Sequence, residues 1–344
     1  MERNGQNMSK KHYPELDRQN VLFCLIVVFI HAFGTLAAKL DPSSYWYILS
    51  KAVLKNCAFV VQGFMFLSAA KYTAVYSGRK LEYGKFIFGR IKKVIIPYIL
   101  CTLVYYTVFL YMGIVDKFSL GELGGYMLRG DLSAQFYFII AIVQFYILMP
   151  LWMFIAKKLP SWSIIIGGVI IYALWMWQAF GYTIYYDRIF LSYLPFWTFG
   201  IAFGKNYDKF KGYVVHHIGK IGTFYVLLFC INGFAGQVFN INPYLLEAMH
   251  TVYAFGAILL SYGFLSGGQR MDGVLAKGIN KLSFEIYLWH CLILKAMDFY
   301  IIKMQLPRIS QEIIVRVGGI YLIIFAVSLF AGLLLKIKNK KRKR

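Results

Sequence analysis

Charged residues are scarce in this chain. Asp, Glu, Lys and Arg make up 15% of its 344 residues, whereas 59% are hydrophobic and the mean hydropathy is +0.59. A soluble domain of this length does not need so much apolar surface, so the composition indicates a membrane protein. The apolar runs are continuous, without the alternation of a transmembrane β-barrel. We therefore expect residues 1–344 to form a single all-α polytopic membrane bundle.

Acidic residues are the scarcer kind of charge, with 15 Asp and Glu against 37 Lys and Arg and a net charge of +22. The basic residues lie in short loops between apolar runs, as the positive-inside rule describes, so we expect no nucleic-acid partner. The densest basic run is 336–344, KIKNKKRKR. We expect it to contact anionic lipid on the cytoplasmic side, and a partner site is the alternative.

Signals for processing and for metal binding are also missing. The first 19 residues are too long and too acidic for a signal peptide, and no small-residue cleavage site follows, so we expect a retained cytoplasmic segment at 1–19. None of the five cysteines has metal-ligand spacing, so we expect small buried apolar residues and no metal. They are Cys24, Cys57, Cys101, Cys230 and Cys291. We find no internal repeat to support an inverted-repeat transporter.

The apolar runs long enough to cross a membrane number ten. They cover about 21–38, 50–70, 94–115, 136–155, 163–180, 189–204, 218–234, 244–266, 282–302 and 313–335. If the N-terminus is cytoplasmic, the inner loops are richer in Lys and Arg than their outer neighbours, with the last outer loop as the weakest contrast. The distribution predicts ten spans with both termini in the cytoplasm.

His31 interrupts the first apolar run, VLFCLIVVFIHAFGTLAA. An imidazole in hydrocarbon is costly without a partner or a function. At 100° per residue, Asn20 differs from His31 by only about 20° and lies about 16 Å below it, and Asp17 and Cys24 share this stripe. The pattern makes His31 a candidate for chemistry inside the membrane. The alternative is a packing histidine bonded to a neighbouring helix.

A basic cluster precedes the third apolar run, in FGRIKKVIIPYIL. Arg90 and Lys93 are three residues apart and are expected to share a helix face, with Lys92 beside them. Cations at this spacing can hold a phosphate or a pyrophosphate. Ordinary positive-inside flanking is the alternative explanation. Pro97 is tolerated in a membrane helix and is expected to bend it.

The later runs contain further polar candidates. His290 lies near the middle of the ninth run, and Glu285 lies nearer its cytoplasmic end, with Lys281 as a possible ion-pair partner. Each of these groups has a structural explanation as well as a functional one.

Two other runs contain polar candidates, and the first of them places its pair in the outer half, where His31 is also expected. Glu247 and His250 are three residues apart in the eighth run, and an acid there can orient a catalytic imidazole. The apolar run 136–151 contains Tyr137, Gln144 and Tyr146. These groups are candidates to line a cavity for sugar or pantetheine, although packing and interface belts also explain tyrosines.

Six segments in order resemble the acyltransferase 3 family of integral membrane acyltransferases. They are ELDRQNVLFCLIVVFIHAFG, GFMFLSAAKY, the basic run that ends at Pro97, QFYFIIAIVQFYILMPL, LPFWTFGIAFGK and SFEIYLWHCLIL. The resemblance covers essentially the whole chain. Within the family, the chain is most similar to stand-alone bacterial members that act on surface polysaccharides, including the O-succinyltransferase-like members of poly-N-acetylglucosamine pathways.

The resemblance implies transfer of an acyl group, acetyl or succinyl, from cytoplasmic acyl-CoA to a hydroxyl of a polysaccharide or glycolipid. It implies that His31 is the catalytic histidine and that Arg90, with Lys92 and Lys93, receives the donor. The chain departs from the family pattern at three positions. Asn20 stands where the family has an arginine, Lys93 stands at the next basic position, and Ser68-Ala69 replaces a Ser-Gly pair.

Two hypotheses follow. In the first, the protein is a multi-pass enzyme of a bacterial inner membrane, with acyl-CoA as co-substrate, no bound cofactor, and a polysaccharide synthase or a second copy of itself as a possible partner. His31 is then the general base, or it carries the acyl group briefly. In the second, the protein exports a polysaccharide or lipid-linked sugar through an aromatic conduit without chemistry. The two hypotheses differ in whether function depends on His31.

Overall fold

The computed structural model describes residues 12–76, 78–267, 272–305 and 309–342, which form helices and connecting loops without a strand. The first half contains α1 (Pro14–Ala37), α2 (Tyr45–Cys57), α3 (Val60–Tyr76), α4 (Tyr83–Arg90), η1 (Ile91–Ile95), α5 (Ile96–Tyr111), α6 (Leu120–Arg129), α7 (Tyr137–Ile147), α8 (Met149–Lys158) and α9 (Ser161–Ala179). The second half contains η2 (Tyr186–Arg188), η3 (Phe190–Tyr193), α10 (Leu194–Lys205), α11 (Tyr207–His216), α12 (Ile218–Val238), α13 (Pro243–Ser266), α14 (Val274–Lys303), α15 (Ile309–Ile313), η4 (Ile314–Gly318) and α16 (Gly319–Arg342).

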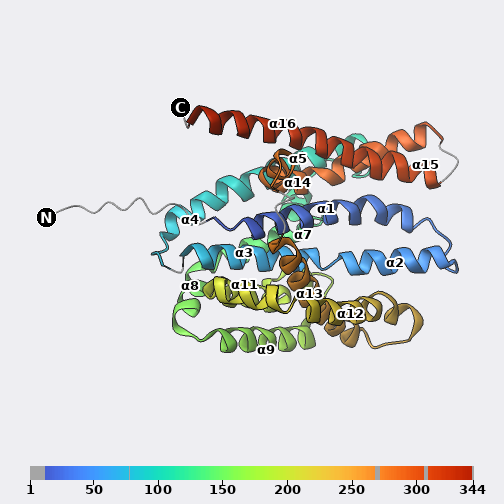
Figure 1. The fold of residues 1–344 in the computed structure, drawn as a ribbon. Helices are drawn as coiled ribbons and strands as arrows, with labels where there is room; N and C mark the ends of the chain where they lie inside the picture. Colours follow the sequence, from blue (N-terminus) through green and yellow to red (C-terminus); the bar gives the residue numbers. More distant parts are fainter. Residues whose placement is uncertain (1–11, 77, 268–271, 306–308, 343–344) are drawn as a thin grey trace.

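Most of the long helices run side by side along one axis (Figure 1). The start of α1 and the end of α16 lie at one end, together with α4 and α8, whereas the start of α2 and α15 lie at the other (Figure 1). We call the first the basic end and the second the opposite end. Both described chain ends therefore lie on one side, as an even number of crossings requires.

The all-α membrane architecture predicted from the sequence is confirmed. In the described part of the chain, seven helical spans are long and apolar enough to cross a membrane, or eight if the bent pair α7 and α8 counts as one. The other two of the ten predicted runs correspond to α10 and α14. With 12 residues, α10 is too short to cross a membrane. With 30 residues, α14 is long enough, but it contains too many charged residues to count as an apolar span. The predicted count of ten therefore exceeds what length and composition support.

Several of the predicted spans are not continuous helices. The second is divided between α2 and α3, and α7 meets α8 at an angle of 57° next to Pro150. The third contains the π-helical segment η1 immediately before Pro97. A second π-helix, η4, begins the last span and contains Arg316. π-Segments are rare and occur frequently at functional sites.

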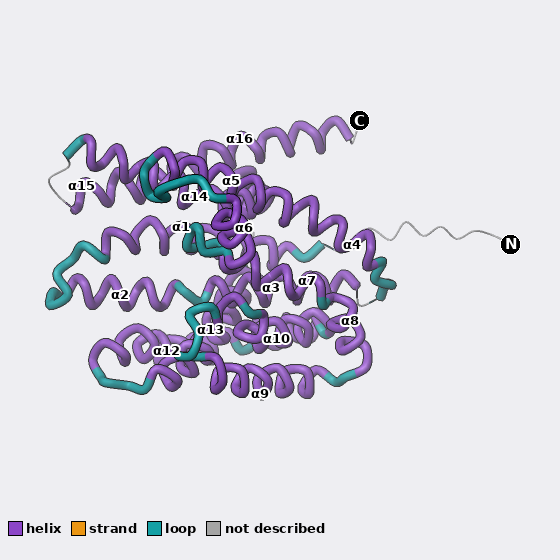
Figure 2. Tube along the Cα trace, turned by 180° about the vertical axis from the view of Figure 1, so that it is seen from behind, coloured by secondary structure: helices purple, strands orange, loops and turns teal. Residues whose placement is uncertain are grey.

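Irregular backbone lies within the bundle as well as at its ends. Figure 2 shows loop segments partway along the bundle, beside α6 and α13. Non-helical backbone at membrane depth is tolerated where it is buried in protein or lines a cavity. The segments before α7 and before α10 both contribute residues to cavities next to His31.

Small residues allow the closest helix contacts, as expected where lipid and protein are equally apolar. A Cβ added at Gly278 of α14 would lie 1.8 Å from the Ser328 carbonyl oxygen, and one at Gly332 of α16 would lie 2.0 Å from the Val274 carbonyl oxygen. The contact is reciprocal and involves backbone atoms, which cannot rotate away. It fixes the basic end of α14 against α16.

We expect Gly278→Ala to lower the free energy of unfolding by about 1–3 kcal/mol, because the added methyl forces α14 away from α16. Gly167→Ala is the matched control, since no atom lies within 4 Å of the added Cβ in that helix. Thermal unfolding of the purified protein in detergent measures both variants. Equal melting temperatures for the two variants would show that the contact contributes little.

Candidate functional site

The two predicted membrane histidines lie next to each other. His31 is in α1 and His290 is in α14, and their ring centroids are 5.0 Å apart with a tilt of 52° between the planes. They come from opposite ends of the sequence, so the contact depends on α1 packing against α14. His290 is almost fully buried, with 1% of its surface exposed.

Cys291 completes a cluster with the two histidines, which we call the His–Cys cluster. The thiol Sγ lies 3.3 Å from Nε2 of His290, while Nδ1 of His290 lies 3.0 Å from the carbonyl oxygen of Ile286. The carbonyl can only accept, so Nδ1 carries the proton and Nε2 is left with a lone pair toward the thiol. Ligand atoms of all three residues lie within 4.8 Å of one another, so the cluster has the donors of a zinc site.

A bridge from α5 holds the helical turn that carries this cluster. The hydroxyl of Tyr105 accepts from the Leu292 amide at 2.8 Å and donates to the Leu288 carbonyl at 2.9 Å. Gln135 donates to the same carbonyl at 3.2 Å. Two elements, α5 and the segment before α7, therefore fix the residues on either side of His290 and Cys291.

Arg316 anchors the helix turn of His31 from the other side. Nε donates to the Ala32 carbonyl at 2.8 Å, and Nη2 donates to Thr35 Oγ1 at 3.0 Å and to the His31 carbonyl at 3.3 Å. Nη1 donates to the Leu294 carbonyl and pairs with Asp298. All five N–H donors of the guanidinium are thus used within the protein. Arg316 can position His31, but it has no donor left for a ligand.

Two cavities meet at His31. The first, about 290 Å³, contains carboxylates, and we call it the acidic cavity. Its polar lining consists of Gln62, Tyr137, Tyr186, Asp187, Ser192, Tyr193, Glu247 and His250. The second, about 370 Å³, is the cationic cavity, with Thr35, Ser133, Cys291, Lys295 and Arg316. His31 is in the lining of both, so a group bound in either cavity can reach its ring.

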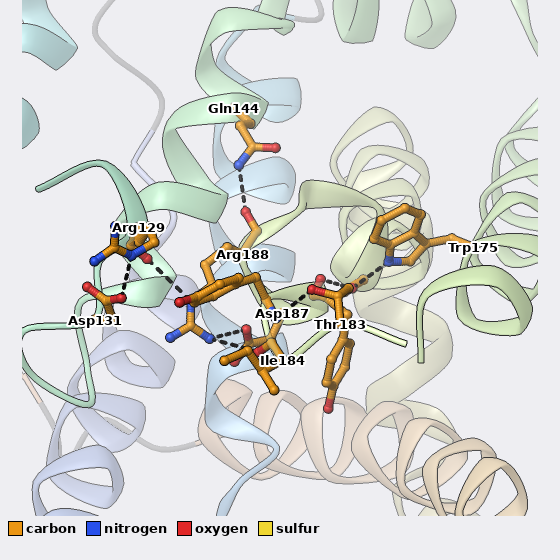
Figure 3. A network of polar contacts seen from close by, with 11 residues as sticks. Arg129, Asp131, Gln144, Trp175, Thr183, Ile184, Asp187 and Arg188 are labelled. Carbon is orange, nitrogen blue, oxygen red and sulfur yellow. Dashed lines mark hydrogen bonds and ion pairs between the residues drawn. The ribbon is translucent and has the colours of Figure 1, made fainter. Parts of the chain in front are cut away.

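A polar network holds the loop that forms one wall of the acidic cavity (Figure 3). Gln144 donates to the Arg188 carbonyl at 2.6 Å and accepts from the Phe190 amide at 3.2 Å. Ser192 accepts from Trp175 at 2.8 Å. Gln144 therefore braces the backbone and does not line the cavity, contrary to the prediction, whereas Tyr137 does line it. Burial raises the pKa of Tyr186 to about 12, so its hydroxyl stays neutral near pH 7.

Glu247 and His250 lie in the cavity that contains His31. Neither of them orients the His31 ring through a hydrogen bond. No carboxylate among the described residues forms a hydrogen bond with the His31 ring, and His250 bonds Asn232 at 3.1 Å. Asn232 in turn donates to Asn56 at 2.8 Å. His31 is positioned through its backbone and by ring contact instead.

Asn20 lies between two other cavities nearer the basic end. Its side chain donates to Asn280 at 2.8 Å and to Ser283 at 3.0 Å. Asn20 lines a narrow cavity of about 120 Å³ with Ser68, Tyr146 and Tyr287. Asn280 lines a cavity of about 750 Å³ at the basic end, which we call the basic cavity. Its cationic lining residues are Arg18, Lys277, Lys281 and Lys336.

The carboxylates of the basic cavity are paired. Asp17 contacts Lys71 at 2.6 Å and His12 at 2.8 Å. Asp272 accepts two hydrogen bonds from Arg18, at 2.5 and 3.0 Å, which lower the pKa of the Asp272 carboxyl below its usual value. Lys277 and Lys281 have no carboxylate partner among residues 12–76, 78–267, 272–305 and 309–342. The cavity therefore presents net positive charge.

The predicted donor cluster around Arg90 is divided. Its guanidinium lies between the rings of Tyr72, Phe86 and Tyr146, at 5.5 to 5.7 Å, and it donates to the Tyr72 hydroxyl. Lys92 and Lys93 belong to η1 and are exposed, with Lys92 over the ring of Phe88. The prediction of one shared face is wrong, because Arg90 is directed inward and the lysines outward.

Glu285 is on a different face of α14 from the His–Cys cluster. It is exposed in a groove between α14 and α16 whose lining includes Val327, Ser328 and also His290. No ion pair joins it to Lys281 within the described part of the chain, contrary to the expectation. The cysteine expectation also needs correction, since Cys230 is exposed and Cys57 and Cys291 are half-buried.

Sequence reasoning missed Arg316 and Cys291. Arg316 had a usable signal, since a charged residue in an apolar run is costly and marks function or pairing. Cys291 had no such signal in the sequence. It does not form a metal-binding motif with the adjacent His290, and His31 is distant in the sequence. Only the fold brings the three together.

These features define an all-α, multi-pass membrane protein with a buried histidine site between cavities. The acyltransferase domain model of the acyltransferase 3 family matches residues 15–336, and the chain belongs to that family. A search of curated proteins found no match to the chain. A search of solved structures found none either.

We expect Arg316→Ala to lower the free energy of unfolding by about 3 kcal/mol, because it removes a buried guanidinium that hydrogen-bonds α1 and α14 and leaves the half-buried Asp298 without its partner. Arg129→Ala is the control, since Arg129 is exposed and pairs with Asp131 at the surface, and we expect a loss below about 1 kcal/mol. Thermal and denaturant unfolding in detergent compares the two variants. Similar losses for both would contradict a special role for the buried arginine.

Proposed function

We propose that this protein is a membrane-embedded O-acyltransferase. It takes an acetyl or succinyl group from cytoplasmic acyl-CoA and transfers it to a hydroxyl of a polysaccharide or glycolipid. The observation that carries the proposal is the position of His31, which lies where two cavities meet and beside the His–Cys cluster. Membership of the acyltransferase 3 family supports the type of reaction.

The basic end supplies the donor side of this proposal. The basic cavity has the volume and the free lysines to receive the phosphates of CoA. The Asn20–Asn280 pair connects it to the narrow cavity, which is mostly apolar and suits a pantetheine arm. We assign this side to the cytoplasm because its exposed lysines follow the positive-inside rule. Arg90 flanks the narrow cavity through its contact with Tyr146.

The acidic cavity supplies the acceptor side. Its tyrosines, serine, carboxylates and histidine offer the hydrogen bonds that a hydroxyl-rich sugar needs. His31 acts as general base on the acceptor hydroxyl, since a base must lie within reach of the proton it removes. The proposed setting is a bacterial cell membrane, with a polysaccharide synthase or a second copy as a partner. The reaction needs no metal or bound cofactor.

His31→Ala is expected to abolish acyl transfer while leaving protein level unchanged, because the acceptor hydroxyl loses its base. His216→Ala is the matched control, since His216 is exposed on α11 away from the cavities. NMR and mass spectrometry of surface polysaccharide from cells with no protein, wild type or each variant measure the result.

O-acyl groups that depend on His31 at constant polymer amount support the transferase. Export is favoured if surface polymer is absent from cells without the protein, is restored by the His31→Ala variant, and contains no acyl groups in any sample. Full acyl transfer by His31→Ala would exclude the proposed base.

The donor site can be located by kinetics. We expect Lys277→Ala combined with Lys281→Ala to raise the KM for acyl-CoA by about 10-fold or more, since each removes a charge-assisted contact to phosphate. Lys157→Ala with Lys158→Ala is the control pair, because these exposed lysines end α8 outside both cavities. If Lys92→Ala with Lys93→Ala has the larger effect on KM, the donor binds at the cluster around η1 and not in the basic cavity.

A further inference from the structure

The donor and acceptor cavities are separated by packed side chains. The lining of the narrow cavity includes Tyr287, whose ring packs against two further lining residues, Phe138 at 5.4 Å and Phe64 at 6.4 Å. The Tyr287 hydroxyl is also bonded to the Gln135 carbonyl. We call these three rings the aromatic barrier. A bulky nucleotide on one side and a sugar on the other cannot meet across it without a large movement.

Cys291 lies just beyond this barrier. It follows Tyr287 by four residues on α14, so the two side chains lie on one helix face about 6 Å apart along the axis. Cys291 lines the cationic cavity, which it shares with His31. A path past Tyr287 along this face of α14 therefore leads to the Cys291 thiol.

We propose that Cys291 carries the acyl group as a thioester between the two cavities, as a catalytic residue of the proposed transferase. The geometry supports a nucleophile paired with a base, because Sγ lies 3.3 Å from Nε2 of His290. The Ile286 carbonyl orients that imidazole at 3.0 Å, as the third member of such an arrangement does. This inference rests on the proposed function.

In the first step, the thiol proton of Cys291 moves to Nε2 of His290. The thiolate attacks the thioester carbonyl carbon, a carbon–sulfur bond to Cys291 forms, and the bond to the CoA sulfur breaks. The CoA thiolate takes the proton from His290 and leaves as the free thiol. A thioester replaces a thioester, so the acyl group keeps its reactivity.

In the second step, His31 takes the proton of the acceptor hydroxyl. The oxygen attacks the carbonyl carbon on Cys291, an ester bond forms, and the bond to Sγ breaks. The thiolate recovers the proton from His31, so both histidines return to their starting state. The amine of Lys295, four residues after Cys291 in the same cavity, forms no ion pair with a carboxylate among the described residues. It can stabilise the negative charge that develops.

The test is protein labelling with acyl-CoA. The purified full-length chain in nanodiscs is incubated with radiolabelled acetyl-CoA or succinyl-CoA without acceptor, and the peptide containing Cys291 is analysed by mass spectrometry. We expect a thioester at Cys291 that neutral hydroxylamine removes. His290→Ala should prevent labelling. His31→Ala should retain or increase it, because only the second step is blocked.

Two cysteine variants provide the control. Cys291→Ala is expected to lose both the label and acyl transfer to polysaccharide, whereas Cys57→Ala, which is half-buried in the same way, keeps both. The wild-type peptide mass does not depend on whether a variant folds. Transfer of acyl groups to polysaccharide by Cys291→Ala would overturn the relay and leave the proposed function intact.

Other outcomes also decide against the relay. Wild-type transfer without any labelled cysteine would indicate direct transfer from CoA to the acceptor. Absence of both label and transfer in wild type would overturn the proposed function as well. Stoichiometric zinc in the purified protein, lost in both His290→Ala and Cys291→Ala, would show that the cluster is a metal centre.

Discussion

The structure depends on satisfying one buried cation. Arg316 lies where water cannot solvate it, and five hydrogen-bond donors must find acceptors inside the protein. Three carbonyls of α1 and α14, the Thr35 hydroxyl and the carboxylate of Asp298 provide them. The same contacts join α1, α14 and the last span, which are the helices that carry His31, His290 and Cys291. The electrostatic requirement of one side chain thereby fixes the relative positions of the reactive groups.

The composition and periodicity of the sequence are sufficient for the fold class and for His31. Long apolar runs have few alternatives in a membrane, and a histidine among them stands out because its cost is high. The direction and contacts of individual side chains were harder to predict, because local sequence patterns do not determine them. The regular spacing of Arg90 and Lys93 implies one face, but the π-helical segment before Pro97 and the aromatic rings around Arg90 separate them. Gln144 gave the pattern of a cavity residue, yet it bonds the backbone of a loop more than forty residues later.

The residues missed in the sequence share a cause. Cys291 belongs to a cluster only because the fold brings it close to His31, which lies some 260 positions away in the chain. Such a relationship has no periodicity and no spacing, so it exists only once α1 packs against α14. The basic cavity could not be predicted for the same reason. Its lysines follow the positive-inside rule, as do the lysines of the other loops, and they form a site only because the packed helices leave a cavity between them.

The aromatic barrier has a consequence for the cell that contains the protein. A membrane stores energy as an ion gradient and a voltage, and an open aqueous path through any protein would discharge it. Tyr287, Phe64 and Phe138 pack together between the narrow cavity and His290. Such packed rings leave no water-filled path for a hydrated ion or a proton, and the acyl group of the proposed relay does not require one. The protein can therefore hold polar cavities open toward both sides while the membrane around it remains electrically insulating.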